Sequence, residues 1–183
     1  MARMRTVWAA TWLVVALVMG GACSKSEAPQ KMAAPPFTAA QIRAATAAGR
    51  TYVWNVVAPG KADSQRRVRF IQADDEGAQI GTQVIDAAGS PVGEEQVVEA
   101  TWSALEGHGT FPVDALKVSD ANVTVPAGTY ACWLYEVKEP DGSEARFWFA
   151  KNLPGAPVRI EAMKDGKLLE TRELVSHEAG KAP

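Results

Sequence analysis

The stretch from Val123 to Val175 decides the fold, and it reads VTVPAGTYACWLYEVKEPDGSEARFWFAKNLPGAPVRIEAMKDGKLLETRELV. Runs rich in Val, Tyr, Trp, Phe and Ile alternate there with short segments that contain Gly, which is the composition of strands and turns. Asp141-Gly142 and Asp165-Gly166 favour tight hairpins, because Gly adopts a positive φ without steric cost. The stretch therefore predicts a meander of antiparallel strands.

The strand predicted from Thr129 to Val137 is apolar on both faces. Trp133 and Tyr135 share one face, while Cys132 and Leu134 share the other. Apolarity on both sides of an antiparallel sheet indicates curvature around a core. We expect a mainly β domain with a single curved antiparallel sheet, a half-barrel or open barrel of about 8–9 strands. A short N-terminal helix and a short helical connection complete this expectation.

Helix-capping residues and the alternation of polar with apolar residues predict the other elements of the domain. Thr38 and Gln41 fit a capping box, and helix formers follow over 39–48, ahead of Gly49. Strands are predicted at 50–58, 66–73, 78–86 and 91–101, and their polar faces indicate solvent on one side. The helical connection is expected at 102–109. The β-domain is expected to span 37–175, followed by a disordered tail at 176–183.

Residues 1–22 have the features of a signal peptide. Arg3 and Arg5 precede an apolar segment at 8–19, and Gly20-Gly21-Ala22-Cys23 follows. Small residues before a Cys resemble the bacterial lipobox, so we expect lipid attachment at Cys23. Gly20 departs from the usual aliphatic residue, and cleavage near Ala22 to give a soluble periplasmic protein is the alternative.

The segment after Cys23 is expected to be a lipidated N-terminus and flexible tether, 23–36. Its polar, Ala- and Pro-rich sequence could extend to about 45 Å. By resemblance to Gram-negative lipoproteins, the absence of Asp after Cys23 favours the outer membrane, with the domain facing the periplasm. Acyl chains on Cys23 would make the membrane a partner.

The charge and the cysteine content argue against a nucleic-acid partner and against an internal disulfide. The chain has 183 residues and a formal charge of -2, and removal of Arg3 and Arg5 leaves 17 basic against 21 acidic side chains. That balance gives no electrostatic argument for nucleic acid as a partner. With Cys23 modified, Cys132 has no disulfide partner, and a lone Cys in an apolar strand is typical of a buried residue.

The aromatic side chains are the candidate ligand-binding residues. A curved sheet lined with aromatics could hold an apolar ligand such as an acyl chain. The alternative interpretation is that the same side chains fill the core. We name four tryptophans as candidates: Trp54, Trp102, Trp133 and Trp148.

No catalytic residue, metal ligand set or cofactor motif is predicted. His108 has Glu106 and Asp114 near it in sequence, but catalytic zinc sites generally need three protein ligands. No G-x-S-x-G elbow supports a serine hydrolase. His177 is assigned to the tail and given no role.

The Pro-Ala-Gly-Thr turn before a strand and the later Ala-Lys-Asn-Leu-Pro-Gly segment resemble a pattern in bacterial envelope proteins. Over 123–161 the chain resembles DUF3108-type and LolA/LolB-type half-barrel domains. This resemblance implies a sheet curled around a helix or loop, and lipid or lipoprotein handling. It carries no catalytic residues.

These observations lead to a non-catalytic, lipid-anchored envelope lipoprotein that binds an apolar ligand (a lipid or acyl chain) or an envelope protein partner. A structural or assembly lipoprotein with a filled core and no ligand is the alternative. An envelope hydrolase that uses His108 is the third hypothesis.

Overall fold

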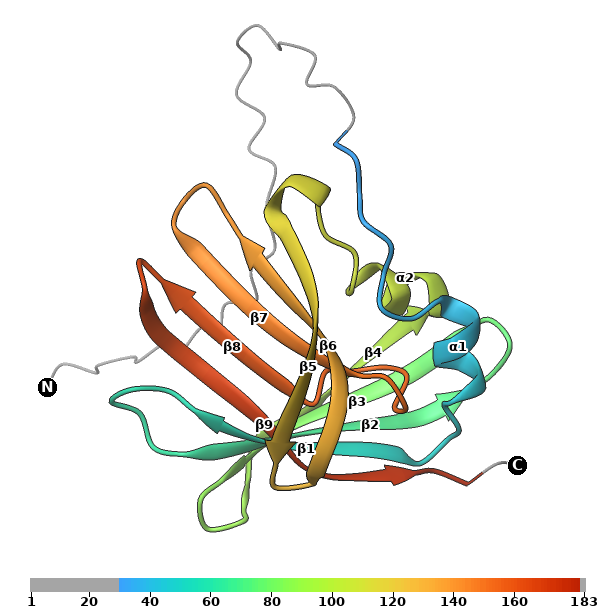
Figure 1. The fold of residues 1–183 in the computed structure, drawn as a ribbon. Helices are drawn as coiled ribbons and strands as arrows, with labels where there is room; N and C mark the ends of the chain where they lie inside the picture. The colour runs from blue at the N-terminus through green and yellow to red at the C-terminus, as the bar shows by residue number, and fades with distance from the viewer. Residues whose placement is uncertain (1–29, 182–183) are drawn as a thin grey trace, which may run out of the picture. The chain divides into compact units, whose positions relative to one another are not determined.

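One nine-stranded antiparallel sheet makes up most of the domain in the computed structural model, which describes residues 30–181 (Figure 1). In chain order, the elements are α1 (Ala39–Ala44), β1 (Arg50–Val57), β2 (Ser64–Ala73), β3 (Gly77–Asp86), β4 (Pro91–Thr101), α2 (Trp102–Gly107), the 3-10 helix η1 (Val113–Ala115), β5 (Leu116–Val125), β6 (Gly128–Lys138), β7 (Ser143–Ala150), β8 (Arg159–Lys164) and β9 (Lys167–Ala179). The prediction of a mainly β fold with two short helices is confirmed.

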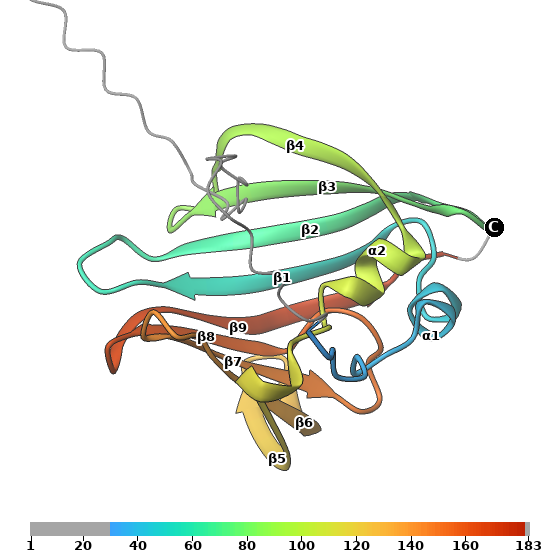
Figure 2. The same ribbon diagram turned by 90° about the horizontal axis from the view of Figure 1, so that it is seen from above.

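The sheet has the order β4-β3-β2-β1-β9-β8-β7-β6-β5 and is open. Two meanders, β1–β4 and β5–β9, are joined in its middle by the pairing of β1 with β9. Figure 2 shows the curvature of the sheet, with β4 and β5 at its two ends. The expected open half-barrel is thus confirmed.

The turns of the second meander follow the sequence prediction. Gly142 and Gly166 adopt φ of +83° and +74°, and Asp165 adopts +50°. Asp141 also accepts a hydrogen bond from the Ser143 amide at 2.9 Å, which closes the turn between β6 and β7. These hairpins set the β6–β7 and β8–β9 registers.

Helix α1 begins as predicted but ends early. Thr38 accepts from the Gln41 amide, and the Gln41 side chain accepts from the Thr38 amide, so the capping box is confirmed. The helix ends at Ala44 instead of continuing to residue 48. The Arg50 guanidinium donates a hydrogen bond to the Ala45 carbonyl at 2.7 Å. This contact provides a partner for a carbonyl at the helix end.

Two predicted boundaries are wrong. The expected tail at 176–183 begins inside β9, where residues 176–179 pair with β1. The expected tether at 23–36 also contains ordered residues, since Met32 bridges Pro112 and the Ala33 amide donates to the Phe111 carbonyl at 2.8 Å. Backbone pairing with distant strands and loops is not visible in the local composition of either segment. The signal peptide and Cys23 lie outside the described residues.

The core lies between the sheet and the segment that carries α1 and α2. Phe37 packs edge-on against Trp133, with ring centroids 5.7 Å apart, and Ile42 and Trp102 are buried with it. We call the sheet face that carries Trp133 the inner face, and the opposite one the outer face. Tyr52 stacks on Trp54 at 5.3 Å on β1, and both are almost fully buried.

A buried arginine ties three segments to this core. Arg50 is 3% exposed, and its guanidinium donates to the Ala45 carbonyl and, at 3.0 Å, to the Pro154 carbonyl. It also lies 4.8 Å from the centre of the Tyr52 ring. Burial raises the pKa of Tyr52 to about 12, against the opposing effect of Arg50.

The outer face of β5–β9 carries a continuous series of ion pairs. Charges alternate in sign across the five strands, in the order Lys117, Glu136, Arg146, Glu161, Arg159 and Glu173. The nitrogen–oxygen distances range from 2.6 to 3.6 Å. Each partly exposed pair contributes modestly by itself, and a connected series is more effective than isolated pairs.

Candidate functional site

The β4 edge of the sheet is the candidate interaction site. Among the described strands, β4 pairs with β3 alone, so the backbone groups on its other side face no partner strand. Every residue of β4 is exposed except Glu95 and Ala100, which are half-buried. A long exposed edge is a template for pairing with another chain.

A bulge shapes the first half of β4. The pairing shifts between Thr82 and Val84, which leaves extra residues of β4 opposite this part of β3. The Gln83 side chain is buried there and donates toward the carbonyls of Val92 and Gly93 at 3.2 and 3.3 Å. The bulge is therefore held by a specific side chain, and regular pairing resumes from Gln96 onward.

The β4 edge combines apolar side chains with negative charge. Val92, Val97 and Val98 are 53%, 48% and 57% exposed. Val98 pairs with Ile80, so it extends the inner face, whereas Val97 pairs with Gly81 on the outer face. Apolar groups exposed on both faces suit an added strand better than a single covering helix.

Three glutamates give the edge its charge. Glu95 forms an ion pair with Arg69 at 2.9 Å, across the outer face. Glu94 and Glu99 are exposed. The edge strand contains no basic residue, so its charge would favour a partner segment that carries Lys or Arg.

The inner face also holds a polar cluster. Arg66 pairs with Trp54 in the register of β1 and β2, and Arg172 pairs with Val56. Arg172 donates to Glu170 at 2.5 Å. Burial, reinforced by the positive charge of Arg172 and opposed by Glu170, lowers the pKa of Arg66. This cluster interrupts the apolar lining that the aromatic residues predicted.

Two of the four candidate tryptophans lie in the core. Trp54 is 5% exposed, and its indole N–H donates to the Pro157 carbonyl at 3.1 Å. Trp102 is 6% exposed and donates to the Asp74 carbonyl at 2.9 Å. Both indoles are therefore satisfied by backbone groups.

The other two tryptophans lie on opposite faces. Trp133 is on the inner face, half-buried against Phe37, with the Lys151 ammonium 5.5 Å from its ring. Trp148 pairs with Leu134 and so lies on the outer face, under the Arg159 guanidinium at 5.3 Å. The structure thus does not gather the four candidates around one site, and their ligand-binding role stays a prediction.

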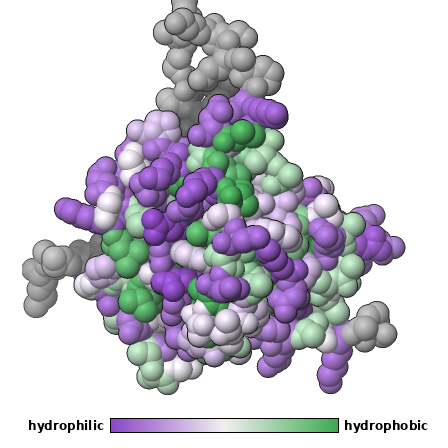
Figure 3. Space-filling view, viewed as in Figure 1, coloured by the Kyte–Doolittle hydropathy of each residue, from purple (hydrophilic) through white to green (hydrophobic). Residues whose placement is uncertain are grey.

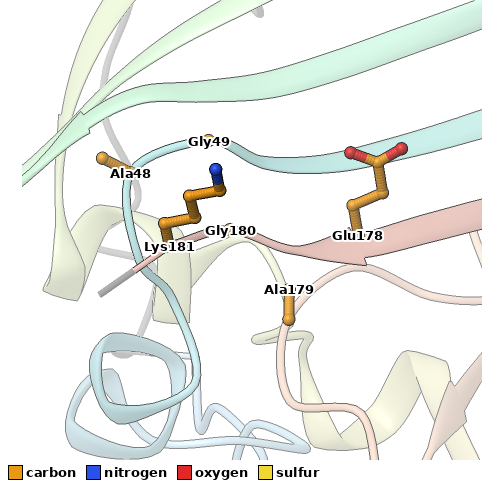
Figure 4. A pocket seen from close by; sticks show the side chains of 6 residues that line it. All are labelled: Ala48, Gly49, Glu178, Ala179, Gly180 and Lys181. Atoms are coloured by element: carbon orange, nitrogen blue, oxygen red, sulfur yellow. The ribbon is translucent and has the colours of Figure 1, made fainter. Parts of the chain in front are cut away.

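Two shallow depressions lie elsewhere. One, of about 350 Å³, lies where the turn before β1 meets the end of β9, and Glu178 and Lys181 are its charged side chains (Figure 4). The other, of about 380 Å³, lies beside the start of β5 and is lined by Asp114 and Lys117 among others. Neither is lined by any of the four tryptophans.

His108 and its neighbour Glu106 have structural positions at the ends of the two helices. His108 is exposed at the C-cap of α2. The Glu106 carboxylate accepts a hydrogen bond from the Ala39 amide at 2.7 Å, at the start of α1. His177 lies in β9, not in a frayed tail. Within residues 30–181, no group of three or more His, Cys, Asp or Glu could hold a metal ion, and no helix is long and apolar enough to span a membrane.

Sequence reasoning placed a strand at 91–101 but did not identify it as the edge. One signal was available, because β4 carries three glutamates and lacks the two-sided apolarity of β6. Charges on a strand are a common protection of sheet edges. The pairing partner of each strand was needed to interpret that signal.

No protein-family model matches the chain, and no curated protein matches it in sequence. Among solved structures, the fold is similar to that of MucB, with a TM-score of 0.52 and 12% identity over 78% of this chain. Two structures of complexes, Pseudomonas aeruginosa MucA/MucB and MucB with MucA(peri), give TM-scores of 0.49 and 14% identity over 73% of this chain. The chain covers 57%, 52% and 51% of the respective MucB chains. At these identities, the likeness to MucB shows the fold alone.

Proposed function

We propose that this chain is a non-catalytic, lipid-anchored protein of the bacterial cell envelope that binds a protein partner through the β4 edge. The observation that carries the binding proposal is the free β4 strand, with exposed valines on both faces and glutamates along its length. The fold likeness to MucB, a protein whose structures include complexes with MucA, supports a binding role. The lipid handling implied by the half-barrel resemblance stays a prediction.

The partner is inferred to be an extended segment with alternating basic and apolar residues. Strand addition would pair its backbone with that of β4, and each apolar side chain would meet a valine of the edge. Its Lys or Arg residues would lie near Glu94 and Glu99, which are exposed. Opposite charges of this kind set partner choice and association rate more than total affinity.

Binding can be measured with two synthetic peptides, one alternating Lys with Val and the other alternating Glu with Val. The natural chain should bind the Lys peptide preferentially, and amide exchange should slow along β4 but not along β5. The E94K/E99K variant should bind the Lys peptide about tenfold more weakly, a difference of about 1.4 kcal/mol. It should also gain affinity for the Glu peptide.

D63K/E139K is the matched control, because both side chains are exposed and the net charge changes equally. Equal loss of binding in the control would mean that net charge, and not the β4 edge, determines affinity. Slowed exchange at strands other than β4 would also contradict the proposal.

The anchor has a separate test. Cys23→Ser should abolish labelling with a radioactive fatty acid and leave a larger precursor, because the acylated Cys is the proposed site of processing. Normal maturation of Cys23→Ser, with no label in either form, would instead support the soluble periplasmic alternative.

A further inference from the structure

Three exposed apolar side chains surround the point where the described chain leads back toward Cys23. Met32, Val113 and Val118 are 48%, 41% and 47% exposed, and we call them the exit patch. Each is a large hydrophobic residue that the fold leaves open to solvent. Exposed hydrophobic side chains that gather in one place mark interaction sites more often than single ones do.

Backbone contacts bring the three residues together. Met32 bridges Pro112, and the Val113 amide donates to the Lys31 carbonyl at 2.9 Å. The Tyr135 hydroxyl donates to the Ala34 carbonyl at 3.4 Å. Val118 is the β5 partner of Tyr135, which places it beside the same segment. In Figure 3, hydrophobic residues gather near the top of the domain, where Figure 1 shows the start of β5.

The length of the preceding chain limits how far this patch can lie from an anchor. Seven residues separate Cys23 from Lys31. Fully extended, they reach about 24 Å, which is less than the thickness of a bilayer with its headgroups. Because residues 31–34 are held by the domain, they add no freedom to this tether.

The local charge leaves apolar contact as the main source of attraction. Lys31 is exposed next to Met32, and Asp114 is exposed next to Val113. Lys117, next to Val118, forms an ion pair with Glu136 at 3.1 Å. These two cations and two anions balance, so neither a strongly anionic nor a cationic protein surface is selected. A lipid surface accepts apolar side chains between its headgroups without such selection.

We propose that the exit patch lies in the lipid headgroup region and fixes the orientation of the domain on the membrane. This inference rests on the proposed lipid anchor at Cys23. It adds a second contact to the acyl chains, and stable attachment commonly takes two such signals. The domain would then be held against the membrane, with a defined set of side chains buried in the interface.

The test uses full-length chain, processed in bacteria and reconstituted on vesicles of phosphatidylethanolamine and phosphatidylglycerol. An environment-sensitive fluorophore is attached in turn to Met32→Cys, Val113→Cys and Val118→Cys. Cys132 is fully buried and is not expected to react. Val97→Cys is the matched control, because Val97 is as exposed as Val118 but lies on the β4 edge.

The exit-patch labels should shift to shorter wavelength and gain intensity on vesicles, while the Val97 label stays unchanged. This shift should persist in high salt, because apolar contact is not screened. Exit-patch labels that stay in water while the protein floats with the vesicles would overturn the inference and leave the anchor intact. If Cys23→Ser floats as well as the natural chain, or the natural chain does not float, the anchor fails and the inference fails with it.

Discussion

The two edge strands of the sheet, β5 and β4, differ in the burial of their side chains. In β5, Val123 and Val125 are 7% and 5% exposed, and the adjoining turn is fastened to the middle of the sheet by the Ala127 amide, which donates to the Leu174 carbonyl at 3.0 Å. In β4, nearly every residue is exposed. Both strands have a free side in the sheet order, so free position alone does not make an edge accessible.

Burial of Val123 and Val125 joins the end of β5 to the core, whereas β4 is held mainly by β3, including the Gln83 side chain. An edge whose own side chains carry the core cannot change its pairing without unfolding. An edge with exposed side chains can accept a strand at little cost to the rest of the sheet. For this reason we infer that a partner binds at β4 and not at β5.

Matched valine truncations give the largest expected difference between the edges. Val123→Ala should lower the free energy of unfolding by about 2 kcal/mol, because it removes buried methyl groups and leaves a cavity. Val97→Ala removes the same atoms from an exposed position and should cost less than about 0.5 kcal/mol. Urea unfolding followed by tryptophan fluorescence measures both, and equal losses would contradict the contrast.

The bulge of β4 can be tested through its buried amide. Gln83→Ala should cost about 1–2 kcal/mol, because the carbonyls of Val92 and Gly93 lose their donor. Gln79→Ala serves as the control, since Gln79 is on the same strand and is only half-buried. Amide exchange should accelerate along β4 in the first variant alone. No difference between the two would mean that the amide does not hold the bulge.

The smallest expected effect is an absence of reaction at Cys132, which pairs with Ala121 of β5. Burial raises the pKa of this thiol to about 11, so at pH 8 the thiol stays protonated as well as inaccessible. A thiol reagent should modify it only after unfolding, whereas Val97→Cys should react at once. Rapid modification of native Cys132 would show that β5 opens as readily as β4.

Local sequence was sufficient for what depends on neighbours along the chain. Asp141-Gly142, Asp165-Gly166 and the Thr38 capping box each specify a turn or a helix start within four residues, and all three are found. The open antiparallel sheet followed from these turns and the apolar runs between them.

What could not be predicted depends on contacts between distant segments. The pairing of residues 176–179 with β1 carries the sheet past the predicted boundary at Val175. Trp148 lies in a strand that is apolar on both sides, so only its pairing with Leu134 places it on the outer face. The edge position of β4 is likewise a property of the strand order. The candidate site therefore emerged from the topology and not from a motif.

The central place of β9 has a consequence for how the protein is made. Among the described strands, β9 joins the two meanders, through its pairing with β1. The chain is synthesised from its N-terminus, so β1–β4 and then β5–β8 leave the ribosome before β9 does. Each of these two sets of strands can form its hairpins locally. The two sets are not paired with each other until β9 emerges. Loss of β9, the thirteen residues Lys167–Ala179, would thus divide the sheet in the middle.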